Sequence, residues 1–227
     1  MKKLLLLLLL MPLLNLSDMA QQAKVHPKNV DPEWLHRFVP SLPSRAVDLT
    51  TPTCHYKPIF GVGDPDALPA DQPIDFNLTP ITVARYGELT VDPKGECKTV
   101  TYPREEQIYV ILKGEGTLHY GDDTSPVRKD DFMYLPPTVA HTVTNSSAQP
   151  LRLVVMGFKI PENVQIEAPA KLKIANLENV EEKVLEWHGP SVQYKLMLGP
   201  RNGKRDTIDE AYVVGSLFWM DFAPRSP

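Results

Sequence analysis

The central part of this chain holds a few residues that could ligate a metal ion. His119 and His141 each offer an imidazole nitrogen, and Glu105 or Glu106 could turn a carboxylate inward. Three or four N, O or S ligands are needed to bind a divalent transition metal tightly. His141, His119 and Glu106 are therefore candidate metal ligands. Since a lone histidine or a glutamate at the start of a strand is more often a hydrogen-bonded polar residue, that role is the alternative for each.

A second set of residues could bind a small organic molecule. Tyrosine can stack on a ligand or hydrogen-bond to it, and glutamine and histidine can hydrogen-bond to it. The candidate ligand-binding residues are Tyr102, Gln107, Tyr109, Tyr134 and His141. Packing in a protein core explains the tyrosines equally well, so both interpretations stay open.

Short strands must position these residues. Residues 108–112 form an apolar run, rich in β-branched residues, that ends at the glycines of 114–116. Similar runs separated by turn residues cover 81–91, 117–120, 132–135, 141–144 and 151–158. Strands this short with turn signals between them predict an all-β, antiparallel sandwich or barrel.

Two of these stretches resemble the motifs of a known family. IYVILKGEG (108–116) is similar to the second half of the first motif of the cupin superfamily, and DDFMYLPPTVAHTVTN (130–145) to the second motif. In that second motif Asp131 stands where glycine is usual, followed by Pro137, His141 and Asn145. The resemblance implies a cupin-type jelly-roll barrel, here predicted over residues 81–162. Many cupins hold a metal through two histidines and a glutamate of the first motif and the histidine of the second.

The first motif departs from the family pattern. Counted back from Gly114, the glutamate position falls on Gln107, and the histidine positions fall on Thr101 and Pro103, or on Val100 and Tyr102. One imidazole and a neutral amide do not make a tight metal site. We therefore expect no cofactor. The alternative is a divalent transition metal bound by a rearranged set that includes His141.

The N-terminal residues of the chain predict an exported protein. Two lysines, an apolar run over 4–14 and a polar exit over 15–20 are the pattern of a secretory signal peptide. An uncleaved anchor is the alternative, but the run is shorter than the about 20 residues of a spanning helix. The secreted or periplasmic protein would begin near Gln21, with residues 21–80 as an arm and loop.

The two cysteines, Cys54 and Cys97, could pair in an oxidising compartment or stay as two buried thiols.

Residues 163–227 resemble the start of a second cupin. The segments at 194–199 and 215–224 echo those at 56–61 and 87–93, which predicts a two-cupin chain whose second barrel is truncated. An ordinary extra strand is the alternative. The strongly apolar strand expected over 212–222 must pair with the barrel or with a second chain, which gives a homodimer through its edge.

Composition limits the partners. The chain has 227 residues, 42% of them hydrophobic, and a formal net charge of -4, so it lacks the basic field of a nucleic-acid-binding protein. No membrane contact is expected after cleavage of the signal peptide. We therefore predict an exported barrel that binds a small molecule. The alternative is a metal-dependent cupin enzyme, a dioxygenase or an isomerase.

Overall fold

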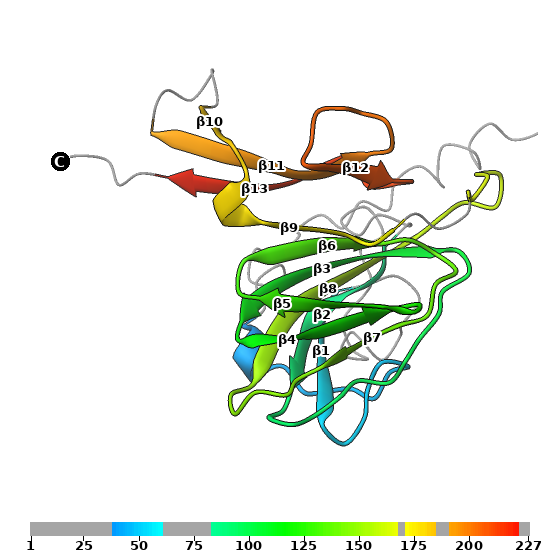
Figure 1. Ribbon diagram of the computed structural model, residues 1–227, viewed down its shortest axis with the longest axis vertical. Coiled ribbons are helices and arrows are strands. Elements are labelled where there is room, and N and C mark those ends of the chain that lie inside the picture. Colours follow the sequence, from blue (N-terminus) through cyan, green and yellow to red (C-terminus); the bar gives the residue numbers. More distant parts are fainter. Residues whose placement is uncertain (1–37, 61–82, 168–170, 185–190, 223–227) are drawn as a thin grey trace, which may run out of the picture. The chain divides into compact units, whose positions relative to one another are not determined.

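Nearly all regular structure in the chain is β-strand. The computed structural model describes residues 38–60, 83–167, 171–184 and 191–222, which form a six-stranded, a three-stranded and a four-stranded sheet (Figure 1). In spatial order the six-stranded sheet consists of β1 (Cys54–Phe60), β2 (Val83–Val91), β8 (Leu151–Lys159), β3 (Glu105–Lys113), β6 (Asp131–Leu135) and β9 (Lys173–Asn176). The three-stranded sheet consists of β5 (Asp123–Arg128), β4 (Glu115–Tyr120) and β7 (His141–Thr144).

The six-stranded and three-stranded sheets face each other across one hydrophobic core. Alternate residues of each strand point into it, as the two-residue period of a strand requires. Tyr109 and Ile111 of β3 pack there with Leu118 of β4 and Val143 of β7. We call this side of the six-stranded sheet the inner face. All pairings within both sheets are antiparallel, which confirms the predicted cupin-type β-barrel.

Turns close the hairpins where the glycine and proline signals lie. Gly114 joins β3 to β4 with a φ of 85°, and a Cβ there would lie 2.6 Å from the carbonyl oxygen of Pro150. At the second motif the left-handed residue is Asp130, with a φ of 69°, whereas Asp131 is buried in β6. The conformation that favours glycine therefore falls one residue before the position expected from the motif.

The four-stranded sheet comes from the C-terminal part of the chain. It contains β10 (Glu182–Val184), β11 (Val192–Pro200), β12 (Ile208–Ala211) and β13 (Leu217–Phe222). Met197, Leu198 and Ile208 pack with Ile108 and Phe132, which lie on the other side of the six-stranded sheet, here called the outer face. Because this packing covers the outer face, β3 and β6 bury side chains on both sides.

The single strand predicted over residues 212–222 is wrong at its first half. Strand β13 begins only at Leu217, and the backbone N–H groups of Tyr212, Val213 and Val214 donate to the side chain of Glu106 instead. Strands β11 and β13 do pair antiparallel, as β1 and β2 do. The two-cupin origin and the homodimer through β13 stay predictions.

The strand predictions at 108–112, 117–120, 132–135, 141–144 and 151–158 are confirmed, whereas β1 and β5 were missed. Strand β5 contains Pro126 and alternates poorly, which suits its place at an edge of its sheet.

The expected signal peptide and most of the arm and loop of 21–80 lie outside the described residues. Cys54 and Cys97 form a disulfide, which resolves the open alternative. The helices of the described ranges are 3-10 turns such as Val39–Ser41 and Leu177–Asn179, and none could span a membrane.

Candidate functional site

The structure divides the predicted site residues among three surfaces. One group lies on the inner face, another on the outer face, and one residue on the outward side of the three-stranded sheet. The first group is Tyr102, Gln107, Tyr109 and His141, the second is Glu106 and Tyr134, and the third is His119. The three candidate metal ligands therefore lie in three different places.

Strands β3 and β7 bring the inner group together. Alternation along β3 places Gln107 and Tyr109 on the inner face, while His141 opens β7 from the facing sheet. The ring centroid of His141 lies 5.8 Å from that of Tyr102 and 5.9 Å from that of Tyr109, with tilted and edge-on geometry. These distances are typical of aromatic contact. Figure 1 shows β3 and β7 in the two facing sheets.

Three polar atoms of this group have no hydrogen-bond partner among the described residues. They are Gln107 Oε1, the Tyr109 hydroxyl and His141 Nε2. Their side chains are almost fully buried, at 0%, 1% and 2% exposure. Leaving a buried polar group unpaired costs about 1–3 kcal/mol, and native proteins contain few such groups. In the described ranges the other buried side-chain atom without a partner is Arg201 Nε, and Glu167 and Tyr212 bind the other two nitrogens of the same guanidinium.

Hydrogen bonding fixes the tautomer of His141. Its Nδ1 lies 3.1 Å from the carbonyl oxygen of Val139, which can only accept, so Nδ1 carries the proton. Nε2 is then a lone-pair acceptor that faces the core. Burial lowers the pKa of His141 below its ordinary value of 6.5, and the charge of Arg85 lowers it further. The ring is therefore neutral at neutral pH.

A group of charged residues borders the inner site. The guanidinium of Arg85, on β2, donates from Nε to Glu105 at 2.8 Å and from Nη1 and Nη2 to Asp48 at 2.7 and 3.1 Å. It also lies 4.5 Å from the ring centre of Tyr102, whose hydroxyl donates to Asp48 at 2.8 Å. Burial alone would raise the pKa of Asp48, but Arg85 and Tyr102 hold it below its ordinary value of 3.8. The positive charge of Arg85 is thus bound by two carboxylates, those of Asp48 and Glu105.

Gly157 leaves the space for this charged group. It lies on β8 between Arg85 of β2 and Gln107 of β3. A Cβ at this position would lie 2.7 Å from Arg85 Cγ and 2.7 Å from Gln107 Nε2, and closer still to Glu105 Oε1. Any larger residue would push the three side chains apart, so Gly157 helps to set the hydrogen bond from Gln107 Nε2 to Glu105.

Sequence reasoning missed Arg85, Asp48 and Gly157. The signal for Arg85 was a charged residue at an inward position of a strand, because a buried guanidinium requires acidic partners. Glu105, rather than Glu106, is the glutamate that lies beside the inner site. Asp48 precedes β1 and carried no signal of its own.

The inner residues do not fit the metal site of the family. Gln107 and His141 supply a neutral amide and one neutral imidazole, and burial raises the pKa of the Tyr109 phenol, which keeps it protonated. Glu105 is already bound to Arg85 and Gln107. Within the described ranges no three His, Cys, Asp or Glu side chains come together in a way that could hold a metal ion. Divalent transition metals prefer anionic or multiple imidazole ligands, so this donor set is poor for them.

Glu106 lies on the outer face, where it hydrogen-bonds to the C-terminal part of the chain. Its buried carboxylate accepts hydrogen bonds from the backbone N–H of Tyr212 at 2.6 Å and from those of Val213 and Val214 at 3.2 Å each. The hydroxyl of Tyr134 donates to it at 2.9 Å. Burial raises the pKa of Glu106, and these four donors oppose that rise. Glu106 and Tyr134 therefore anchor the segment between β12 and β13.

His119 and Asn145 also have structural partners. His119 Nε2 lies 3.0 Å from the hydroxyl of Thr144, on the side of β4 opposite to the buried Leu118 and Tyr120. Asn145, the last residue of the second motif, donates to the carbonyl oxygens of Val91, Asp92 and Gln149. The motif asparagine therefore fixes the loop between β7 and β8.

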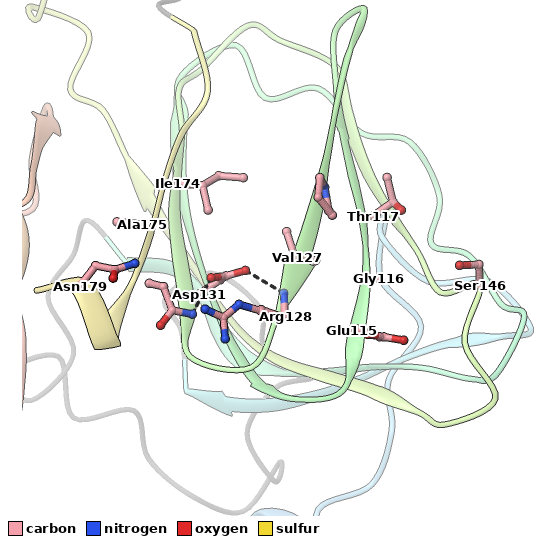
Figure 2. A pocket seen from close by; sticks show the side chains of 12 residues that line it. Glu115, Gly116, Thr117, Val127, Arg128, Asp131, Ser146, Ile174, Ala175 and Asn179 are labelled. Atoms are coloured by element: carbon pink, nitrogen blue, oxygen red, sulfur yellow. Dashed lines mark hydrogen bonds between the residues drawn. The ribbon is translucent and has the colours of Figure 1, made fainter.

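A separate cleft of about 640 Å³ lies between the two sheets at their β5 and β9 edges. Figure 2 shows Ile174 and Ala175 on one side of it, and Val127, Gly116 and Thr117 on the other. Asp131 accepts hydrogen bonds from Arg128 N and from Asn176 Nδ2, each at 2.7 Å. A small molecule would fit in this volume. Among the described residues, however, no buried side-chain atom without a partner lines this cleft, so the inner group is the better candidate site.

The chain matches a known family and several known proteins. Residues 87–157 match the family model described as Cupin domain. Over 53 residues the chain is 32% identical to the uncharacterized protein MJ1618 of Methanocaldococcus jannaschii, a match that covers 23% of this chain and 42% of that protein. The chain thus spans less than half the length of this relative.

Two solved structures are similar in fold. The crystal structure of GK1651 from Geobacillus kaustophilus superposes with a TM-score of 0.53 at 12% identity, covering 78% of this chain and 66% of the other. A putative glyoxylate-induced protein from Pseudomonas aeruginosa gives a TM-score of 0.51 at 12% identity, covering 68% of this chain and 52% of the other. At such identities the similarity extends to the fold alone.

Proposed function

We propose that this chain, which belongs to the cupin superfamily through its domain at residues 87–157, is an exported protein that binds a small molecule inside its barrel. The observation that carries the proposal is that three buried polar atoms, on Gln107, Tyr109 and His141, have no hydrogen-bond partner among the described residues. A core that served stability alone would gain by losing them. Buried polar atoms that lack a protein partner are the atoms to which a bound ligand can hydrogen-bond.

We do not propose the alternative function, that of a metal-dependent enzyme. The inner residues offer one imidazole and no free carboxylate, and Glu106 and His119 lie on other faces. Binding through hydrogen bonds and aromatic contacts uses the groups that are present.

Thermal unfolding with a panel of small molecules tests the binding proposal. The panel contains neutral diols, carboxylic acids, alkylammonium ions and uncharged aromatics, each added to wild type, to the double variant Tyr109→Phe/His141→Phe and to the outward control His119→Gln. At a concentration 100 times its Kd, a ligand should raise the Tm by about 5 °C or more. We expect at least one class to do so for wild type and the control but not for the double variant. Equal shifts in all three proteins, or none with any class, would refute the proposal.

Export is supported by the N-terminal pattern and by the disulfide. Disulfides persist in oxidising compartments and are rare in the cytosol, and Cys54 and Cys97 are bonded. Mass spectrometry of the full chain expressed in a bacterium should find mature protein that starts near Gln21 in the periplasm or the medium. Soluble cytosolic protein with an intact N-terminus would contradict export.

A further inference from the structure

The unpaired atoms of the inner group have defined hydrogen-bond roles. Gln107 Nε2 donates to the carboxylate of Glu105, which can only accept, so Gln107 Oε1 is the free end and an acceptor. His141 Nδ1 is bound to the carbonyl oxygen of Val139, so His141 Nε2 is also an acceptor. The Tyr109 hydroxyl can donate or accept. A complementary ligand must therefore donate at least two hydrogen bonds.

The charges beside the site exclude an anion. The guanidinium of Arg85 is bound by Asp48 on one side and by Glu105 on the other, with no N–O distance above 3.1 Å. A carboxylate or phosphate ligand would meet two negative charges and a cation that is already neutralised. It would also bring lone pairs towards two acceptors, Gln107 Oε1 and His141 Nε2.

A cation is disfavoured for a different reason. Burying an ammonium without a carboxylate that hydrogen-bonds to it is costly. Glu105 is bound by Arg85 and Gln107, and Asp48 by Arg85 and Tyr102, so neither carboxylate is free to turn. The buried atoms of the inner group that have no partner in the described part of the chain all belong to neutral side chains.

The rings define the apolar part of the ligand. Tyr102 and Tyr109 both lie within 6 Å of the His141 ring, centre to centre, and their planes are inclined to it by 54° and 71°. Arg85 covers the ring of Tyr102. These contacts hold the His141 ring in place and give the site an aromatic surface against which the apolar part of a ligand can pack.

We propose that the inner site takes a neutral cyclic molecule with two adjacent hydroxyl groups, as in a monosaccharide. One hydroxyl donates to Gln107 Oε1 and the other to His141 Nε2, while the Tyr109 hydroxyl hydrogen-bonds to an oxygen of the ligand. This inference rests on the proposed function, because it assigns the ligand class of the same site.

A series of matched ring compounds tests the ligand class. Ligand-observed NMR and calorimetry would compare cis-1,2-cyclohexanediol, cyclohexanecarboxylate, cyclohexylammonium and cyclohexanol, together with D-glucose and D-xylose, on the full oxidised chain. We expect the diol and at least one sugar to bind at least about tenfold more tightly than the carboxylate, the ammonium and the mono-alcohol, since each discriminating hydrogen bond contributes about a factor of ten.

Two variants show whether the binding occurs at this site. Tyr109→Phe removes one hydrogen-bonding group with little change of shape and should weaken diol binding about tenfold. His119→Gln, on the outward side of β4, should leave it unchanged. Circular dichroism confirms that both variants are folded.

The outcomes separate this inference from the proposed function. If the carboxylate or the ammonium binds most tightly and Tyr109→Phe weakens it, the ligand class is wrong and the binding function stands. If the diol binds equally to wild type and Tyr109→Phe, the assigned site is wrong. If none of these compounds binds, this inference fails, and the broader panel decides the function.

Discussion

Tyr109 and Tyr134 are buried tyrosines of neighbouring strands in one sheet, and their hydroxyls face opposite sides with opposite environments. The hydroxyl of Tyr134 donates to Glu106 at 2.9 Å on the outer face, whereas that of Tyr109 has no partner among the described residues on the inner face. Tyr109 lies on β3 and Tyr134 on β6, and these two strands pair with each other. The outer pair stabilises the fold, and the inner hydroxyl is available to a ligand.

The first prediction compares the two tyrosines. Tyr109→Phe should raise the free energy of unfolding by about 1 kcal/mol, because it removes an unpaired buried hydroxyl. Tyr134→Phe should lower it by about 1.5–3 kcal/mol, since it removes a hydrogen bond to a buried carboxylate. Urea unfolding of both variants without ligand measures the difference. Equal losses in the two variants would show that Tyr109 serves stability.

The second prediction concerns the anchor of the C-terminal segment. Glu106→Gln keeps the shape of the side chain but directs an NH₂ group at backbone N–H donors, so it should weaken the attachment of residues 212–214 by about 2–4 kcal/mol. Trypsin should then cleave faster after Lys204 or Arg205 in the turn between β11 and β12. Glu115→Gln is the matched control, since Glu115 is exposed. If Glu106→Gln and wild type were cleaved at the same rate, the anchor would be unimportant.

Strand periodicity predicted the barrel but could not tell the two faces of β3 apart. Gln107, Tyr109 and Ile111 alternate with Glu106, Ile108 and Val110, and both sets contain apolar residues because the C-terminal sheet covers the outer face. The sequence therefore grouped Glu106 and Tyr134 with the inner residues.

The charged part of the site could not be predicted because its members come from remote segments. Asp48, Arg85 and Glu105 meet only when β2 and β3 lie on either side of β8. Local sequence does not specify which acidic residue neutralises a buried arginine. Cys54 and Cys97 illustrate the same limit, since their pairing depends on how close the folded chain brings them.

The third prediction is that the disulfide stabilises the barrel. It closes a loop with a sequence separation of 43 residues and holds the start of β1 against the segment that follows β2. In the chain-entropy treatment a loop of this length gives about 4 kcal/mol. Cys54→Ala/Cys97→Ala should lower the free energy of unfolding by about 2–4 kcal/mol in urea. Thiol labelling of unfolded, unreduced wild type should find no free cysteine, and two free thiols there would contradict the pairing.

The fourth prediction concerns the pH dependence that His141 gives to stability. Its pKa is lowered from 6.5 by burial and by Arg85, while Asp48 and the hydrogen bond to Val139 oppose that shift, and the rings of Tyr102 and Tyr109 lie against it. As the pH falls below 6.5, the unfolded chain therefore takes up the proton before the folded chain does. The contribution of neutral His141 to the free energy of unfolding is therefore fully present above the unfolded pKa of 6.5. It is lost as the pH falls towards the lower pKa of the folded state.

Urea unfolding at about pH 7.5 and about pH 5.5 measures this effect in wild type, His141→Phe and Gln107→Met, at pH values on either side of the ordinary pKa of histidine. Wild type and Gln107→Met should lose more stability between the two conditions than His141→Phe, because the last variant has no imidazole to protonate in the unfolded chain. Gln107→Met is the matched control, since it changes the same site without removing a titrating group. Diol binding should weaken only at the lower pH at which the folded protein takes up this proton, because protonated Nε2 can no longer accept a hydrogen bond. An equal loss in all three proteins would mean that His141 is not held neutral by its surroundings, and its assignment as a hydrogen-bond acceptor would then be wrong.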